Sequence, residues 1–175
     1  MIAHMDLRLQ NVLLDNDCGV RVCDYGNAVS WQGLDTDTVK AGTIAGTLSR
    51  MAPEMLNMSE NFSAIKADVW CLGLILFELL TSKPLFDNTD EQDVIAKIIR
   101  GDFEPLGLGF SQEARILCSD MLSLNPQERP TCDEILQYEW LCKEEIQPAI
   151  SQGLIFVDPA PEYGVLKQKF LQCLD

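Results

Sequence analysis

Two acidic residues and one amide stand close together near the start of the sequence: Asp6, Asn11 and Asp24. Carboxylate and amide oxygens on loops suit Mg²⁺, which keeps several waters and takes only one or two carboxylates from a protein. A lone aspartate in a turn is far more often a turn former or a helix cap than a metal ligand. The joint spacing of these three residues, Asp6 to Asn11 by five positions and Asn11 to Asp24 by thirteen, weighs against that structural interpretation.

Short strands are the elements that must position these groups. Residues 11–15 and 20–23 are apolar and rich in β-branched side chains, and the four residues between them, NDCG, favour a turn. The pattern predicts a β-hairpin with Asn11 before its first strand and Asp24 just past its second. A tight hairpin brings these two side chains together.

Five blocks of sequence follow one another in a recognisable order: HMDLRLQN at 4–11, CDYG at 23–26, MAPE at 51–54, DVWCLG at 68–73 and NPQERP at 125–130. They resemble the ordered signature of the eukaryotic protein kinases, H-R-D-L-x-x-x-N, then D-F-G, then A-P-E. The resemblance covers roughly residues 1–141. It implies a mainly α fold, a kinase C-terminal lobe built as a helical bundle with a small β-hairpin, without the N-terminal lobe.

The resemblance also implies roles for individual residues. Asp6 is expected to be the catalytic base that accepts the proton of the substrate hydroxyl. Asn11 and Asp24 are expected to bind Mg²⁺, with Asp24 holding the ion that bridges the nucleotide phosphates. His4, the sole histidine, is interpreted as a packed structural residue of the loop rather than a proton shuttle.

Three further positions point to the substrate and the nucleotide. Arg8 stands two residues after Asp6, where Ser/Thr kinases usually carry a lysine that contacts the transferred phosphate. Thr47 matches a threonine that in Ser/Thr kinases bonds the catalytic aspartate and its lysine. Leu13 matches the apolar floor of the adenine pocket, with a plain core leucine as the equal alternative. The resemblance thus implies ATP and Mg²⁺ as cofactors and serine or threonine in a protein substrate.

The sequence departs from the family in two respects. Met5 replaces an arginine that commonly receives a phosphate on the activation loop, so we expect that switch to be lost. No G-x-G-x-x-G-x-V or V-A-I-K stretch occurs in the sequence, and these segments cradle ATP in a kinase. Glu54 and Arg129, by contrast, match a buried ion pair that ties the activation segment to the lower lobe.

Four segments are predicted to be helical. Residues 68–80 are apolar on all sides, which predicts a helix surrounded by protein. Without the helix that precedes the catalytic loop in kinases, part of its apolar surface is expected to be exposed. One-face spacing predicts amphipathic helices over 90–100 and 111–122. Thr131 opens a capping box, so a further helix should run from there to about Trp140.

Two other segments are expected to differ from this helical core. Residues 27–50 are polar and contain several glycines, which predicts a long surface loop.

The resemblance divides the chain into a partial kinase domain, residues 1–141, and a tail, residues 142–175. Within the tail, apolar residues spaced by four over 162–174 predict a short amphipathic helix.

Composition narrows the class of protein. Thirteen basic against 27 acidic residues give a net charge of −14, which excludes nucleic acid and anionic lipid as partners and favours basic peptides. The longest apolar run, residues 69–77, is too short to span a bilayer. Seven cysteines without a C-x-x-C pair indicate reduced thiols, and no signal peptide is recognisable, so we expect an intracellular, cytoplasmic protein.

Two functional hypotheses remain open. The first is a serine/threonine protein kinase represented by its C-terminal lobe and inactive by itself; the intact Asp6, Asn11 and Asp24 favour it. The second is a noncatalytic, pseudokinase-like binding or scaffold module, in which a partner covers the exposed surface of the lobe. Met5 and the absent ATP-cradling segments favour this second hypothesis.

Overall fold

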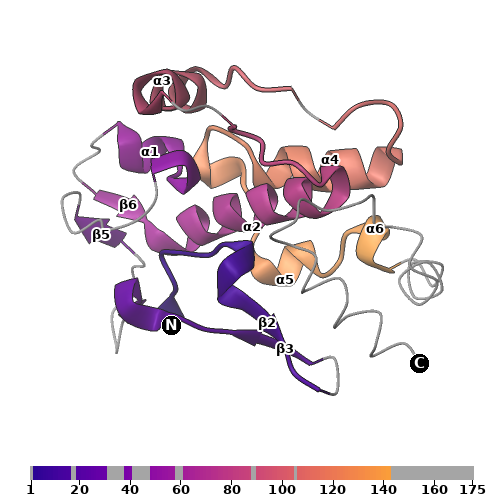
Figure 1. Cartoon of the computed structure of the whole chain (residues 1–175), viewed down its shortest axis with the longest axis horizontal. Helices are drawn as coiled ribbons and strands as arrows, with labels where there is room; N and C mark the ends of the chain where they lie inside the picture. Colours follow the sequence, from indigo (N-terminus) through magenta and orange to yellow (C-terminus); the bar gives the residue numbers. More distant parts are fainter. Residues whose placement is uncertain are drawn as a thin grey trace.

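The computed structural model describes residues 2–16, 19–30, 38–40, 48–57, 61–87, 90–104 and 106–142. These residues form α-helices and three small two-stranded antiparallel sheets, as shown in Figure 1. The helices are α1 Pro53–Leu56, α2 Ala64–Thr81, α3 Glu91–Arg100, α4 Gln112–Met121, α5 Cys132–Ile135 and α6 Glu139–Cys142. The predicted mainly α class is confirmed. Among the described helices, none is both long and apolar enough to cross a membrane.

Helix α2 crosses the middle of the molecule, between α3 and the hairpin formed by β2, Val12–Leu14, and β3, Val20–Val22 (Figure 1). It begins four residues earlier than predicted because Ser63 caps it, accepting a hydrogen bond from the Lys66 N–H at 3.1 Å. Ser82 ends it with a left-handed backbone, φ 57°. The expectation of a helix surrounded by protein holds for most of α2, but Leu79 is 44% exposed.

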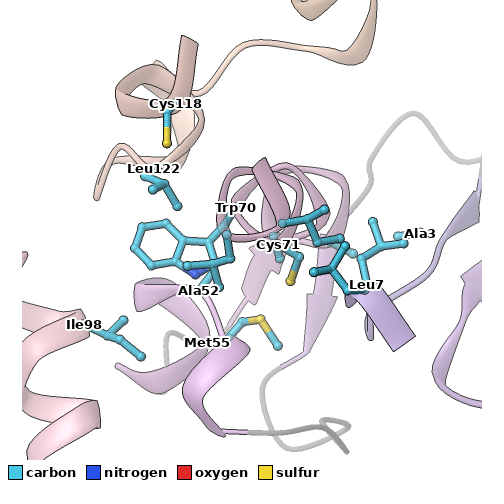
Figure 2. Packing of buried hydrophobic residues seen from close by; sticks show 14 of the residues in the cluster. Ala3, Leu7, Ala52, Met55, Trp70, Cys71, Ile98, Cys118 and Leu122 are labelled. Atoms are coloured by element: carbon cyan, nitrogen blue, oxygen red, sulfur yellow. The ribbon is translucent and has the colours of Figure 1, made fainter. Parts of the chain in front are cut away.

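The core gathers around Trp70 of α2, which is fully buried. Figure 2 shows its indole among Ala52, Ile98 and Leu122, which come from the segment before α1, from α3 and from the end of α4. Helices α2 and α4 approach closely at Gly73, where a Cβ atom would lie 2.9 Å from Leu122 Cγ. Buried residues of the four helices α1, α2, α3 and α4 therefore form one hydrophobic core.

The two predicted amphipathic helices are confirmed as α3 and α4. Asp90 caps α3 by accepting the Gln92 N–H at 3.0 Å, and Ser111 caps α4 by accepting the Ala114 N–H at 3.2 Å. Gly101 ends α3 with a φ of 68°, a conformation that glycine adopts without steric cost.

The predicted helix from Thr131 to about Trp140 is wrong in its length. The capping box is present, with the Glu134 N–H donating to Thr131 Oγ1 at 3.2 Å and the Thr131 N–H to Glu134 Oε2 at 2.7 Å. Helix α5 nevertheless ends at Ile135. The next backbone hydrogen bonds, from Gln137 to Glu134 and from Tyr138 to Ile135, join residues three apart instead of four, as in a 3₁₀ turn. Tyr138 then donates its hydroxyl to Asp120 Oδ2 on α4 at 2.7 Å, and α6 starts afresh.

The predicted surface loop over 27–50 is interrupted by short strands. Strand β4, Val29–Ser30, pairs with β1, Ile2–Ala3, and β5, Thr38–Lys40, pairs with β6, Asn61–Ser63. Val39 and Phe62 are directly paired and both are buried, so this part of the segment is anchored to the core. The predicted tail helix over 162–174 lies outside the described residues.

Candidate active site

The hairpin predicted around residues 16–19 is present. Strand β2, Val12–Leu14, pairs antiparallel with β3, Val20–Val22. Asp15 closes the turn because its Oδ1 accepts the Gly19 N–H at 2.7 Å. Beyond the strands, the Cys23 N–H donates to the Asn11 carbonyl at 2.9 Å, which continues the ladder by one step. Asn11 and Asp24 are therefore held at the same end of the hairpin.

Asn11 is tied to the loop that carries Asp6. Its side-chain Nδ2 donates to the Asp6 carbonyl oxygen at 2.9 Å, and the residue is buried. Because the nitrogen end of the amide is used for this bond, Oδ1 remains as the acceptor that could serve a cation. This single hydrogen bond joins the first two predicted site residues.

His4 links the same loop to the hairpin. Its Nδ1 accepts the Asp6 N–H at 3.3 Å, and its Nε2 lies 2.8 Å from the Cys23 carbonyl oxygen. The ring therefore has its proton on Nε2, donates to that carbonyl, and packs against Tyr25 at 4.9 Å between ring centroids. This geometry agrees with the interpretation of His4 as a packed structural residue.

Asp68 of α2 holds the backbone of residues 4–8, the loop that carries Asp6 and is expected to be the catalytic loop. Its two carboxylate oxygens accept the N–H groups of His4 at 2.6 Å and Met5 at 2.9 Å. Met5 has a left-handed backbone with φ 66°, which is unfavourable for a side chain of this kind and is fixed by the bond. Burial raises the pKa of the Asp68 carboxyl above its usual range, while the two N–H bonds oppose that shift.

The sequence analysis did not predict that Asp68 binds the backbone of His4 and Met5. It used the residue only as the first position of the DVWCLG block at 68–73. Glu78, further along α2, forms a second such case, because it is buried and pairs with Arg50. The signal available in the sequence was an acid within an otherwise apolar helix. Such an acid needs a partner when it is buried, and the partner identifies the segment that packs there.

Asp24 follows the hairpin in a left-handed conformation, φ 64° and ψ 65°, and is exposed. For a residue other than glycine this conformation costs about 1–2 kcal/mol, and such strain concentrates at functional positions. Its carboxylate makes no cap bond to the short helix that follows, Tyr25–Asn27. Asp24 is thus an exposed residue directly after Cys23, whose N–H bonds to the Asn11 carbonyl.

The remaining predicted site residues are less tightly placed. Arg8 is half-buried and its Nε donates to Gln10 Oε1 at 2.9 Å. Leu13 lies in β2 opposite Arg21 and is 45% exposed, so it presents apolar surface rather than filling the core. Thr47 lies outside the described residues.

The predicted Glu54–Arg129 ion pair is present and nearly closed to solvent. Arg129 donates from Nη1 and Nη2 to the two Glu54 oxygens at 2.7 and 2.8 Å. Nη1 and Nε also donate to the Lys66 and Ser123 carbonyls, each at 2.8 Å, and the guanidinium lies 5.2 Å from the Trp70 ring centroid. Four of the five N–H donors of this arginine thus have partners, so it fixes α1 to α2 and to the segment after α4.

Asn11 and Asp24 fit the ligand set that Mg²⁺ requires. They offer one amide oxygen and one exposed carboxylate, both oxygen ligands, at the same end of the hairpin. Within the described part of the chain, no group of three His, Cys, Asp or Glu side chains could hold a metal. A site with few protein ligands suits Mg²⁺, which keeps several waters and also binds substrate phosphates.

Comparison with known proteins agrees with this arrangement. The protein kinase domain family matches residues 1–141. The cell cycle serine/threonine-protein kinase CDC5/MSD2 of Saccharomyces cerevisiae is 35% identical over 140 residues, which are 79% of this chain and 19% of that protein. The serine/threonine-protein kinase Nek6 of Oryza sativa subsp. japonica is 35% identical over 140 residues, 80% of this chain and 25% of that protein.

A third relative has a similar extent of similarity. The CBL-interacting serine/threonine-protein kinase 13 of Arabidopsis thaliana is 35% identical over 142 residues, which are 81% of this chain and 28% of that protein. The chain thus spans between about a fifth and somewhat over a quarter of the length of these three relatives.

Proposed function

The chain belongs to the eukaryotic protein kinase family, and from this premise we propose that it supplies the catalytic-loop half of a serine/threonine protein kinase. The observation that carries the proposal is the chain of hydrogen bonds from Asp68 through the catalytic loop to Asn11. These bonds fix the backbone on either side of Asp6 and the side chain of Asn11, at the end of the hairpin that leads into Asp24, and they support the proposed roles of these residues. In this proposal the described residues correspond to the C-terminal lobe of a kinase.

Asp6 is the proposed base. Its peptide group is held on both sides, because its N–H donates to His4 and its carbonyl accepts from Asn11. The half-buried carboxylate projects from this fixed backbone and accepts the proton of the substrate hydroxyl. Arg8, two residues after Asp6, supplies positive charge for the transferred phosphate. Thr47 is assigned to bond Asp6 and Arg8.

ATP and Mg²⁺ are the cofactors that this assignment requires. When bound, Mg²⁺ neutralises the phosphate charge that develops during transfer. Asn11 Oδ1 and the Asp24 carboxylate would hold the ion, and the left-handed backbone at Asp24 keeps the carboxylate beside the hairpin end. The exposed Leu13 would cover one face of the adenine ring.

The 175 residues by themselves are proposed to be inactive. They contain no glycine-rich strand and no V-A-I-K lysine, and no other residue takes over the positioning of the terminal phosphate. Incubation with MgATP and a basic serine peptide is expected to give no turnover. Turnover that is abolished by Asp6→Asn would contradict this part of the proposal.

The catalytic assignment itself is tested by completing the site. A fusion of the ATP-binding half of a related kinase, such as rice Nek6, to residues 1–175 is expected to phosphorylate serine or threonine peptides. Asp6→Asn and Asp24→Asn should each lower kcat by at least about a hundredfold, whereas the exposed control Asp133→Asn should not. Equal activity of the Asp6→Asn and native fusions would reject the assignment.

A noncatalytic binding module is the second candidate, and Met5 is the observation that favours it. The Met5 side chain offers no charge for an activation-loop phosphate. Its backbone is nevertheless held in place, because its N–H donates to Asp68 Oδ1. If the completed fusion is folded and binds MgATP but transfers no phosphate, the second candidate replaces the first. If it is active, phosphatase treatment is expected to leave its activity unchanged.

A further inference from the structure

A pocket of about 270 Å³ lies away from the catalytic loop, between α2, the segment that leads from α3 into α4, and the end of α4. Figure 1 shows α4 and the segment that leads into it on the side of α2 opposite the β2–β3 hairpin. Its apolar wall includes Phe77, Phe103 and Leu122. Phe103 is fixed by edge-to-face packing on Trp70, at 6.1 Å between ring centroids, so this wall is part of the core.

The rim of the same pocket is acidic. Glu104, Asp120 and Glu128 line it, and none of the described residues that line it is a lysine or arginine. Neutral donors hold two of these carboxylates in place. Tyr138 donates to Asp120 at 2.7 Å, and Ser123 donates its hydroxyl to Glu128 at 2.9 Å.

Glu104 differs from the other two acids. It is exposed, and no hydrogen bond or ion pair joins it to another residue that the structure describes. The three negative charges around the pocket are therefore balanced by no cation in its lining. An incoming cation meets them without having to displace a basic side chain of the protein.

We infer that this pocket docks a segment of a partner protein in which an arginine stands beside an apolar side chain. The guanidinium forms charge-assisted hydrogen bonds with the rim carboxylates, while its aliphatic stem and the apolar neighbour lie on the Phe77 wall. The pocket volume is below the range of sites for drug-sized ligands, which suits one or two anchoring side chains of a peptide. The net charge of −14 attracts such a segment over longer distances.

The inference does not depend on phosphoryl transfer. The lining residues lie on α2, α4 and their neighbouring segments, and none of them is one of the proposed catalytic groups, which are Thr47 and residues within 6–24. A failure of the proposed kinase activity would leave this binding measurable, and a failure of binding would leave the kinase proposal intact.

The test uses the full chain and fluorescence anisotropy with a labelled peptide of sequence Gly-Ser-Leu-Arg-Leu-Arg-Ser-Gly. A matched peptide carries citrulline in place of arginine, which keeps the shape and most of the hydrogen-bonding groups but removes the charge. The arginine peptide is expected to bind at least about tenfold more tightly than the citrulline peptide. Equal binding of the two, or no binding of the arginine peptide, would overturn the inference.

Variants then locate the binding. Glu104→Gln removes one rim charge at an exposed position and is expected to weaken binding of the arginine peptide about fivefold to tenfold. Ser119→Arg places a cation of the chain itself at the pocket and is expected to abolish binding. Glu91→Gln removes the same charge from the exposed start of α3, outside the lining, and should leave binding unchanged.

Thermal melting of each variant provides the folding control. Glu104 and Ser119 are exposed, so neither substitution removes core packing, and each variant should melt within a few degrees of the native chain. If Glu104→Gln and Glu91→Gln weaken binding equally, the attraction is a property of the overall charge and the pocket is not the site.

Discussion

The proposed catalytic region, residues 2–30, and the helical body, residues 48–142, differ in the interactions that hold their residues in place. In the helical body Trp70, Ile98 and Leu117 are almost completely buried. In the catalytic region every residue of β3 is exposed, and Asp6 and Asn11 are placed by hydrogen bonds. The apolar body supplies a fixed reference, and polar contacts arrange the chemical groups upon it. Asp68 belongs to both, since it lies in α2 and bonds to the catalytic loop.

The largest expected effect is in the helical body. Arg129→Met leaves Glu54 buried without its cation, which is expected to lower the free energy of unfolding by about 3–5 kcal/mol in urea denaturation. The double variant Glu54→Leu with Arg129→Met removes both charges and should recover part of the loss. A loss below about 1 kcal/mol for the single variant would show that the body does not depend on this pair.

The next effect concerns the junction of the two regions. Asp68→Asn can still accept one of the two backbone N–H bonds but not both, so we expect a loss of about 2 kcal/mol, concentrated in the catalytic region. Hydrogen exchange at the His4 and Met5 amides should accelerate while the amides of α4 stay protected. The exposed Asp133→Asn is the matched control. Uniform acceleration across α4 would mean that the two regions do not separate.

Alkaline pH should also weaken the helical body. Burial raises the pKa of the Cys71 thiol from its usual 9.0 to about 12. Above about pH 9 the unfolded chain loses this proton while the folded chain keeps it, so the free energy of unfolding falls as pH rises toward about 12. This stability is fully present below about pH 9.

Cys71→Ser removes this thiol but can keep the hydrogen bond that Cys71 donates to the Arg50 carbonyl. The free energy of unfolding, measured by urea denaturation, should therefore fall less steeply above about pH 9 in Cys71→Ser than in the native chain, by no more than about 1.4 kcal/mol per pH unit. An identical pH dependence of stability in the two proteins would show that burial in the helical body does not raise the pKa of Cys71.

The smallest effect is expected in the hairpin. Arg21 pairs with Asp15 at 2.9 Å, but the Arg21 side chain is 73% exposed. Arg21→Ala is expected to cost less than about 1 kcal/mol in urea denaturation, and the difference should shrink in high salt. A cost like that of Arg129→Met would remove the contrast between the two regions.

Elements with local signals were predictable from the sequence. Thr131 starts α5 with the predicted capping box, and Ser111 starts α4 at the predicted residue. The strand pairs β1–β4 and β5–β6 were not predictable because, unlike β2 and β3, the paired strands are not joined by a short turn. Their partners, such as Ile2 and Ser30, are far apart in the chain.

The sequence predicted which residues form the candidate site, but not the backbone conformations and hydrogen bonds that position them. Spacing and resemblance selected Asp6, Asn11 and Asp24, and the hairpin followed from its turn. The left-handed backbones at Met5 and Asp24 were not predictable, because methionine rarely adopts that conformation, and aspartate, although enriched there, adopts it at only a minority of its positions. The support from Asp68 required knowing which loop packs on α2.

The close approach of α2 and α4 at Gly73 restricts how this protein can evolve. Any side chain at position 73 meets Leu122 Cγ at 2.9 Å and Met121 Cβ at 3.1 Å, and the second of these atoms cannot swing away. Descendant sequences that replace Gly73 must therefore change position 122 in the same lineage or separate the two helices. Positions 73 and 122 are expected to covary among relatives, so that two residues 49 positions apart are inherited as one unit.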